Sequence, residues 1–307
     1  MAGRVPALQF NTEFEAEAGR PVAVAHRTMR VSAPNVGPYT FKGTNSFIVG
    51  TDSVAVLDPG PDSDAHLEAL VAAIGGRRVE AIILTHTHLD HSALVPKLRA
   101  ATGAPVWSGG LHRLSRPRRL FELNPVGRES DWRHRPDRVL LDGERITVAG
   151  VALEVIATPG HCANHLAFGL LDTPWLFTGD HIMGWNSTLV AVPDGSMADY
   201  LHSLEKVIGL GYSSYLPAHG GAIADGPAYA HALLAHRQER NRQVVAGVEA
   251  GARRIGELLA RIYPGLDPLL RGAAAMTLKA HVEYLADRGL IGADHGVFGT
   301  SLFPASG

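Results

Sequence analysis

Four short apolar segments of this chain each run into a side chain that can bind a metal ion. They cover residues 79–84, 151–157, 175–178 and 212–216, and their β-branched and aliphatic composition predicts strands. The polar side chains that follow these segments are, in order along the chain, His86, His88, Asp90, His91, His161, Asp180 and His219. Because strand ends can gather at one sheet edge, the sequence predicts that these seven side chains form one metal site.

The spacing of the first histidines suits a single ion. His86 and His88 are two positions apart, and in an extended segment such side chains point the same way, so both can reach one ion. His161 would supply a third imidazole. A fourth position would then remain for water, as a catalytic zinc site requires.

The remaining ligands predict a second, neighbouring ion. Asp90 and His91 diverge from the first pair at the start of the following helix, and they would bind this ion together with His219. Asp180 would bridge the two ions, because a carboxylate has two oxygens and a negative charge that offsets two cations. Imidazole with a minority of carboxylate favours zinc, with manganese and iron as alternatives.

Two such ions predict a hydrolytic reaction. A pair about 3.5 to 4 Å apart can hold a hydroxide, orient a substrate and stabilise the developing oxyanion, so neither a Ser nor a Cys nucleophile is needed. We assign Asp90 and Asp180 to the catalytic set, since Asp90 could also pass a proton to the leaving group. Cys162, the only cysteine, excludes a disulfide within the chain and is interpreted as a small buried residue.

The ordered motifs resemble those of the metallo-β-lactamase superfamily. The H-x-H-x-D-H run at 86–91 is followed by Gly-His, Gly-Asp and Ala-His-Gly segments in the order of that family. Ser92-Ala93 departs from the Ser-Gly that relatives often carry. The resemblance implies a four-layer αββα sandwich, which the alternation of strand and helix patterns also favours. It further implies that Asp58 lies near the metals, where its carboxylate would orient a ligating imidazole.

Three further segments are similar to one β-lactamase-like subgroup, which includes a mitochondrial single-strand endoribonuclease and many bacterial hydrolases of unassigned substrate. These segments are GTNSFIVG at 43–50, LDPG at 57–60 and HRQER at 236–240. The resemblance implies that a small helical, winged-helix-like domain follows the hydrolase domain. A shift to Ala- and Arg-rich helical periodicity places the boundary near residue 224, which gives domains 1–224 and 225–307.

This subgroup favours single-stranded RNA or another phosphoester as the substrate. A small thioester, lactone or other ester is the alternative substrate class. A metal-stabilised module that binds nucleic acid or protein without catalysis is a third interpretation, although seven potential ligands exceed the four of a closed structural zinc site. The tail from residue 227 carries an excess of only two positive charges, so packing on the hydrolase domain, shaping its pocket or forming a homodimer are equally open roles.

Four other residues are candidates for contact with the substrate. His165 lies four positions after His161, and Trp185 lies in a loop just after Asp180. The segment 113–138 holds eight arginines against four carboxylates, and within it Arg118 and Arg119 could steer a phosphate-bearing substrate. A solvated protein surface would explain these arginines equally well.

Overall charge and the N-terminal sequence constrain partners and location. With 28 basic and 30 acidic residues among 307, the formal charge of −2 gives no global reason to expect a polyanionic partner. The first 19 residues lack the basic start and apolar middle of an export signal, and no stretch of about 18 apolar residues occurs. We therefore expect a cytoplasmic protein without a membrane partner.

Overall fold

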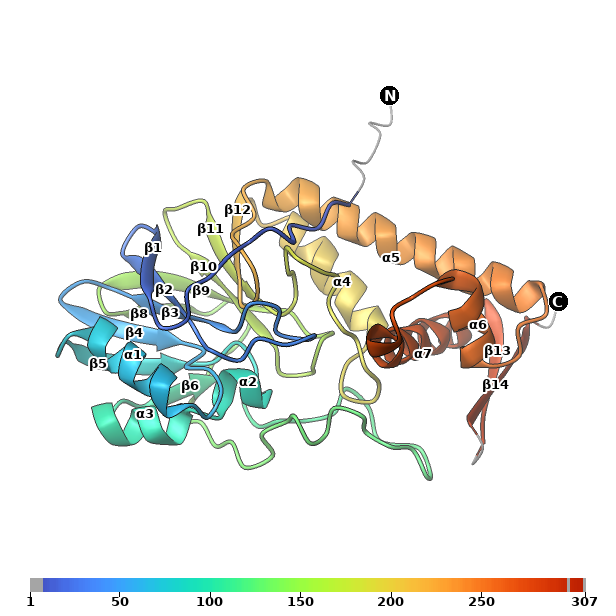
Figure 1. The fold of residues 1–307 in the computed structure, drawn as a ribbon, viewed down its shortest axis with the longest axis horizontal. Helices are drawn as coiled ribbons and strands as arrows, with labels where there is room; N and C mark the ends of the chain where they lie inside the picture. Colours follow the sequence, from blue (N-terminus) through green and yellow to red (C-terminus); the bar gives the residue numbers. More distant parts are fainter. Residues whose placement is uncertain (1–7, 297–298, 306–307) are drawn as a thin grey trace.

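Two β-sheets face each other at the centre of the molecule, and helices cover their outer faces (Figure 1). The computed structural model describes residues 8–296 and 299–305. The first sheet has the order β1-β2-β3-β4-β5-β6-β7, and the second has the order β12-β11-β10-β9-β8. This arrangement is the predicted αββα sandwich, and the fold class is confirmed.

The first sheet is formed by β1 (Pro21–Ala25), β2 (Thr28–Ser32), β3 (Asn45–Val49), β4 (Ser53–Leu57), β5 (Arg78–Ile83), β6 (Val106–Ser108) and β7 (Arg138–Val139). The second sheet is formed by β8 (Arg145–Val148), β9 (Val151–Ala157), β10 (Leu166–Leu170), β11 (Trp175–Gly179) and β12 (Ser214–Pro217). The helices of the sandwich are α1 (Asp64–Ile74), α2 (Leu89–Ser92), α3 (Val95–Thr102) and α4 (Met197–Ile208).

Three apolar clusters correspond to the three interfaces between the four layers. Between the sheets, Phe47 of β3 meets Phe177 of β11 edge to face, with ring centroids 5.1 Å apart. On the outer face of the first sheet, α1 and α3 pack against alternate residues of β4 and β5. On the outer face of the second sheet, α4 and the start of the next helix pack on β9, β10 and β11. The strands are therefore buried on both faces, which explains their nearly continuous apolar composition.

Helix α1 shows how local sequence sets an element's ends. Ser63 caps it by accepting a hydrogen bond from the backbone N–H of His66, and Gly75 ends it in the left-handed conformation, with φ 62°. The apolar spacing of the sequence predicts a helix over 64–74, and α1 has these bounds. The alternating apolar residues over 22–31 predict a single strand. The structure divides it into β1 and β2, because Arg27 adopts φ 52° and turns the chain into a hairpin.

The C-terminal region contains α5 (Gly226–Glu249), α6 (Ile255–Ile262), the 3-10 turn η1 (Pro268–Leu270), α7 (Arg271–Asp287) and the hairpin strands β13 (Ile291–Gly296) and β14 (Gly299–Pro304). These elements share an apolar core of their own, to the right of the sandwich in Figure 1. The sequence after residue 227 predicts three helices and then a wing over residues 293–303. The structure has three helices followed by a hairpin, and residues 297–298 of the expected wing lie outside the described residues. The winged-helix assignment stays a prediction.

Helix α5 belongs to two apolar cores. Its first half contributes Leu233 to the core on the second sheet, and its second half contributes Val244 and Val248 to the C-terminal core. The predicted boundary near residue 224 falls just before this helix and stays a prediction. Within the described part of the chain, no helix combines the length and apolar character needed to cross a membrane.

Neighbouring residues of α1 provide a matched test of the outer core. Leu70 is fully buried between α1 and the first sheet, whereas Val71 is 44% exposed. We expect Leu70→Ala to lower the free energy of unfolding by about 2 to 5 kcal/mol through lost burial and a residual cavity. Val71→Ala should change it by about 0.5 kcal/mol or less. Urea unfolding of both variants measures the difference, and equal effects would contradict this packing.

Candidate metal centre

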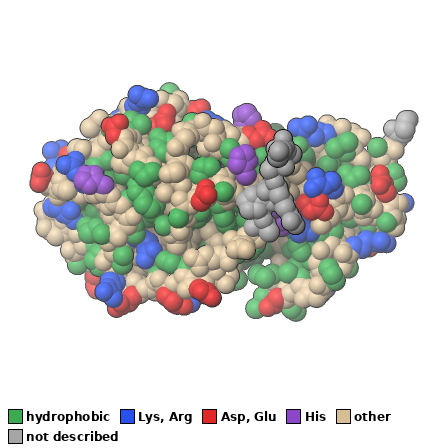
Figure 2. Space-filling view, turned by 90° about the horizontal axis from the view of Figure 1, so that it is seen from above, with side chains coloured by type: hydrophobic (Ala, Val, Ile, Leu, Met, Phe, Trp, Pro, Cys, Tyr) green, Lys and Arg blue, Asp and Glu red, His purple; other side chains and the backbone are tan. Residues whose placement is uncertain are grey.

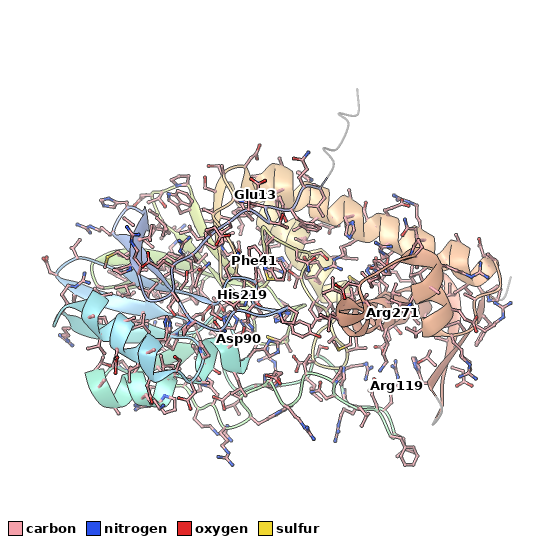
Figure 3. The ribbon with its side chains drawn as sticks, in the orientation of Figure 1. Glu13, Phe41, Asp90, Arg119, His219 and Arg271 are labelled. Carbon is pink, nitrogen blue, oxygen red and sulfur yellow. The ribbon has the colours of Figure 1, made fainter. Side chains whose placement is uncertain are left out.

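The predicted ligands lie together at the ends of their strands. In the first sheet β4 and β5 are parallel, and in the second β11 and β12 are parallel, so the carboxyl ends of each pair open at one edge. Figure 3 shows Asp90 and His219, which are far apart in the sequence, facing each other at this edge. The structure brings all seven predicted side chains into three overlapping groups whose ligand atoms lie within 4.8 Å of one another.

Three imidazoles form the first group. His88 Nδ1 lies 3.1 Å from His86 Nε2 and 2.8 Å from His161 Nε2. All three rings are buried, and burial lowers the pKa of His161 to about 4. Neutral imidazoles whose ring nitrogens converge in this way can ligate one cation.

Gly160 allows His161 to reach this group. Its φ is 142°, and a Cβ at this position would lie 2.4 Å from the backbone Cα of Tyr200 at the start of α4. Only glycine therefore permits the close approach of this turn to α4. In the Gly-His pair, glycine is therefore required for steric reasons, and histidine supplies the imidazole of the predicted metal ligand.

Carboxylates and imidazoles form the second group. Asp90 Oδ2 lies 3.4 Å from His91 Nε2 and 3.2 Å from His219 Nε2. Asp180 Oδ1 lies 3.3 Å from His219 Nε2, and its Oδ2 lies 3.7 Å from His161 Nε2. The two oxygens of Asp180 thus face different groups, as a bridging carboxylate would.

Unpaired buried atoms test whether cations fit here. His91 Nε2, His219 Nε2 and Asp180 Oδ1 are buried without a hydrogen-bond partner among the described residues. Burial alone would lower the pKa of His219, but the Asp180 and Asp90 carboxylates outweigh it and raise that pKa to about 10. The group therefore favours an added positive charge, and a divalent ion in place of the proton satisfies all three atoms. The number and identity of the ions stay predictions.

Asp58 occupies the orienting position predicted for it. Its carboxylate accepts hydrogen bonds from the backbone N–H and the hydroxyl of Thr85, each at 2.7 Å, and its Oδ2 lies 3.1 Å from His91 Nδ1. This contact fixes the ring of His91 with Nε2 directed at the second group.

Asp194 is a second orienting carboxylate that the sequence analysis did not identify. Its Oδ2 lies 2.9 Å from His88 Nε2, and its Oδ1 lies 2.9 Å from His112 Nε2. Asp194 and His112 are both buried. His112 is therefore a core residue whose ring is hydrogen-bonded within the protein, and it supports the site through Asp194. In the sequence Asp194 stands in a Pro-Asp-Gly segment that is typical of an ordinary turn, so no local signal indicated its role.

His165 is placed differently from its prediction as a substrate contact. It is 1% exposed, its Nδ1 lies 2.8 Å from Thr158 Oγ1, and its Nε2 accepts a hydrogen bond from the backbone N–H of Asp180 at 3.1 Å. Both ring nitrogens are used inside the protein. The structure thus gives His165 the role of positioning Asp180.

The other predicted substrate contacts do not line the cavity over the cluster. Trp185 stacks on Phe41, with ring centroids 4.8 Å apart, and lines an adjacent cavity. Arg119 is paired with Glu283 of α7, and Figure 3 shows it well separated from Asp90. Arg118 lines a separate surface hollow beside Trp132.

A cavity of about 430 Å³ opens over the metal-binding side chains. Six of its lining residues carry polar or charged groups, namely Thr40, His88, Asp90, Glu129, His161 and Asp180. Most of the others are apolar or aromatic, among them Tyr39, Val126, Met183, Leu189 and Met276. Met276 comes from α7, so the C-terminal region forms part of this wall.

The sandwich, the strand-end ligands and the cavity define a metallohydrolase-type site. Residues 39–219 match the sequence model of the metallo-beta-lactamase superfamily, and the chain belongs to this superfamily. The lactamase-like protein adaB of Aspergillus niger is 28% identical over 289 residues, which are 88% of this chain and 83% of adaB. The atrochrysone carboxyl ACP thioesterase of Aspergillus fumigatus is 28% identical over 231 residues, which are 73% of this chain and 65% of that protein.

Solved structures show the same fold along nearly the whole chain. A metallo-beta-lactamase family protein from Thermus thermophilus matches with a TM-score of 0.74 at 27% identity, covering 92% of this chain and 100% of that chain. A beta-lactamase domain protein from Burkholderia ambifaria matches with a TM-score of 0.77 at 20% identity, covering 97% of each chain. The similarity therefore extends beyond the sandwich into the C-terminal region.

Removal of the charge on Asp194 tests its support of His88. We expect Asp194→Asn to weaken zinc binding by about 10- to 100-fold, because the His88 ring loses its anionic partner. Competition with a chromophoric chelator measures this affinity. Asp52→Asn, at an exposed position in the turn between β3 and β4, is the matched control and should leave it unchanged. Equal affinities for the two variants would show that Asp194 does not support the metal ligand.

Proposed function

We propose that the protein is a metal-dependent hydrolase, with zinc as the first candidate ion, that cleaves a thioester or a related carboxylic ester. The choice of substrate class rests on the charge of the residues that line the cavity. Among the described residues that line the cavity over the cluster, none is a Lys or an Arg, and the carboxylates of Asp90, Glu129 and Asp180 contribute negative charge. Such a cavity suits an uncharged acyl group better than a chain of phosphates.

The arginines of the 113–138 segment give the phosphoester alternative less support than their number indicated. Arg116 pairs with Glu122 at 2.7 Å and with Glu283 of α7 at 2.6 Å, and Lys279 pairs with Glu122 at 2.7 Å. These charges tie the segment to α7 and neutralise one another. Figure 2 shows another face, on the α5 side of the molecule, where basic and acidic side chains are interspersed and form no single basic patch.

The similarity to a protein named as an ACP thioesterase supports the same substrate class. A thioester carries no phosphate at the carbonyl that reacts, so hydrolysis there requires no cluster of basic side chains. RNA cleavage, which the subgroup resemblance implied, is retained as the competing outcome of the test below.

The side chains can be assigned consistent tasks in such a reaction. Bound divalent ions would polarise the substrate carbonyl and lower the pKa of a water molecule. His86, His88 and His161 would hold one ion, and Asp180, whose two oxygens face the two groups, would contribute a carboxylate between them. Asp90, whose side chain is 29% exposed and lines the cavity, would accept a proton and return it to the leaving thiol.

The first experiment compares the two substrate classes on one preparation. Zinc- or manganese-loaded protein is assayed with S-acyl-N-acetylcysteamine thioesters and with a labelled single-stranded RNA. We expect thioester hydrolysis and no RNA cleavage, and both activities should be absent from a His86→Ala, Asp180→Ala double variant purified in parallel. Cleavage of RNA by the unmodified protein alone, without thioester turnover, would reverse the assignment.

A further inference from the structure

A second cavity of about 150 Å³ adjoins the one over the metal-binding cluster. The two share the lining residues Pro38, Tyr39, Met183 and Leu189, so they lie on either side of the same side chains. The second cavity is closed by the C-terminal region, through the start of α7 and the turn before it. A molecule bound at the cluster can therefore extend toward this space.

Arg237 of α5 lines the second cavity and is only 2% exposed. Its Nη2 donates a hydrogen bond to the backbone carbonyl of Thr188, and its guanidinium lies 5.0 Å from the centre of the Tyr200 ring. Its Nε has no hydrogen-bond partner, and no carboxylate of the described residues forms an ion pair with it. A buried guanidinium without a counter-ion is costly, because the charge has lost its hydration.

Trp185 provides an independent observation on the same cavity. Its indole Nε1 is buried and also lacks a hydrogen-bond partner among the described residues. Both unpaired groups are donors, and a guanidinium or an indole N–H cannot accept a hydrogen bond. A ligand that satisfies both must present acceptors, and the uncompensated charge of Arg237 favours an anionic one.

The backbone links this anion-binding position to the metal cluster. The carbonyl of Thr188 accepts from Arg237, and the carbonyl of the next residue, Leu189, lies 2.7 Å from His161 Nδ1. The path from the guanidinium to His161 Nε2 consists of two hydrogen bonds, one peptide unit and the width of an imidazole ring. The lengths of these parts place the two groups within roughly 13 Å of each other. A short acyl chain, or the arm of a carrier thiol, can cover such a distance.

We propose that the second cavity binds an anionic group, a carboxylate or a phosphate, at the far end of the substrate, with Arg237 as its counter-ion. The inference rests on the proposed thioester or ester hydrolysis and specifies which thioesters are preferred. A carboxylate would belong to the acyl part of the substrate, and a phosphate would belong to the 4′-phosphopantetheine arm that leaves.

Paired substrates distinguish these two sources. In one arm, ω-carboxyacyl thioesters of N-acetylcysteamine with about four to eight carbons are compared with neutral acyl thioesters of equal length. In the other, one neutral acyl group is carried on pantetheine or on 4′-phosphopantetheine. We expect kcat/KM to be at least about tenfold higher for the anionic member of one pair, mainly through KM. No preference in either arm would overturn the proposal.

Variants show whether Arg237 causes the preference. Arg237→Gln should abolish the preference for the anionic substrate while the neutral substrate keeps its kcat/KM to within about twofold. Ala274→Met, which fills the cavity without changing the guanidinium, should also reduce the preference for the anionic substrate. Arg242→Gln on the same helix, where Arg242 pairs with Glu239 at the surface, is the matched control and should retain the preference. Equal loss for both substrates in both cavity variants would mean that Arg237 serves only the fold.

A binding measurement keeps this inference separate from the proposed function. Non-hydrolysable thioether analogues of the anionic and neutral substrates are titrated calorimetrically into metal-loaded protein. We expect the anionic analogue to bind more tightly to the unmodified chain and to lose that advantage in Arg237→Gln. If no thioester is hydrolysed but this difference persists, the proposed reaction fails and the anion site stands. If thioesters are hydrolysed and the difference is absent, only the anion site fails.

Discussion

The concentration of carboxylates and imidazoles at one buried sheet edge is the constraint on which the rest of the molecule depends. Asp180 has unpaired oxygen in a setting where burial penalises its charge, and the facing His91 and His219 rings hold its pKa far below the ordinary value. Such a group is costly to assemble from protein atoms alone. The apolar cores on both sides of each sheet supply the rigidity that holds it together, and a bound cation would offset the remaining charge.

The sequence was sufficient to predict which side chains gather at this edge, because each motif is local and sits at the end of a strand that is easily recognised. His86, His88 and His91 are separated by a few residues, and the strands fix where the more distant ligands arrive. The supporting residues could not be found in this way. Asp194 lies 106 positions from His88, and nothing in a Pro-Asp-Gly segment indicates that its carboxylate turns inward.

Counting charges along the chain left the role of the 113–138 segment open for a related reason. Its arginines suited either an anionic substrate or a solvated surface, and in the structure Arg116 and Arg119 are bound to Glu283, more than 160 positions away. A count along the chain cannot show which charges meet after folding. Arg237 is the opposite case, because its place in a helix of mixed charge gave no sign that it would be buried without a carboxylate partner.

Helix α5 joins the two cores without interruption over 24 residues. A continuous helix resists bending, so the C-terminal region cannot swing on a flexible connection in the manner of a hinged lid. The wall that α7 adds to the cavity is therefore fixed at nearly one distance from the metal-binding side chains. Selection among substrates would then depend on whether a molecule fits an opening of constant width, and entry and exit would require no large rearrangement of the chain.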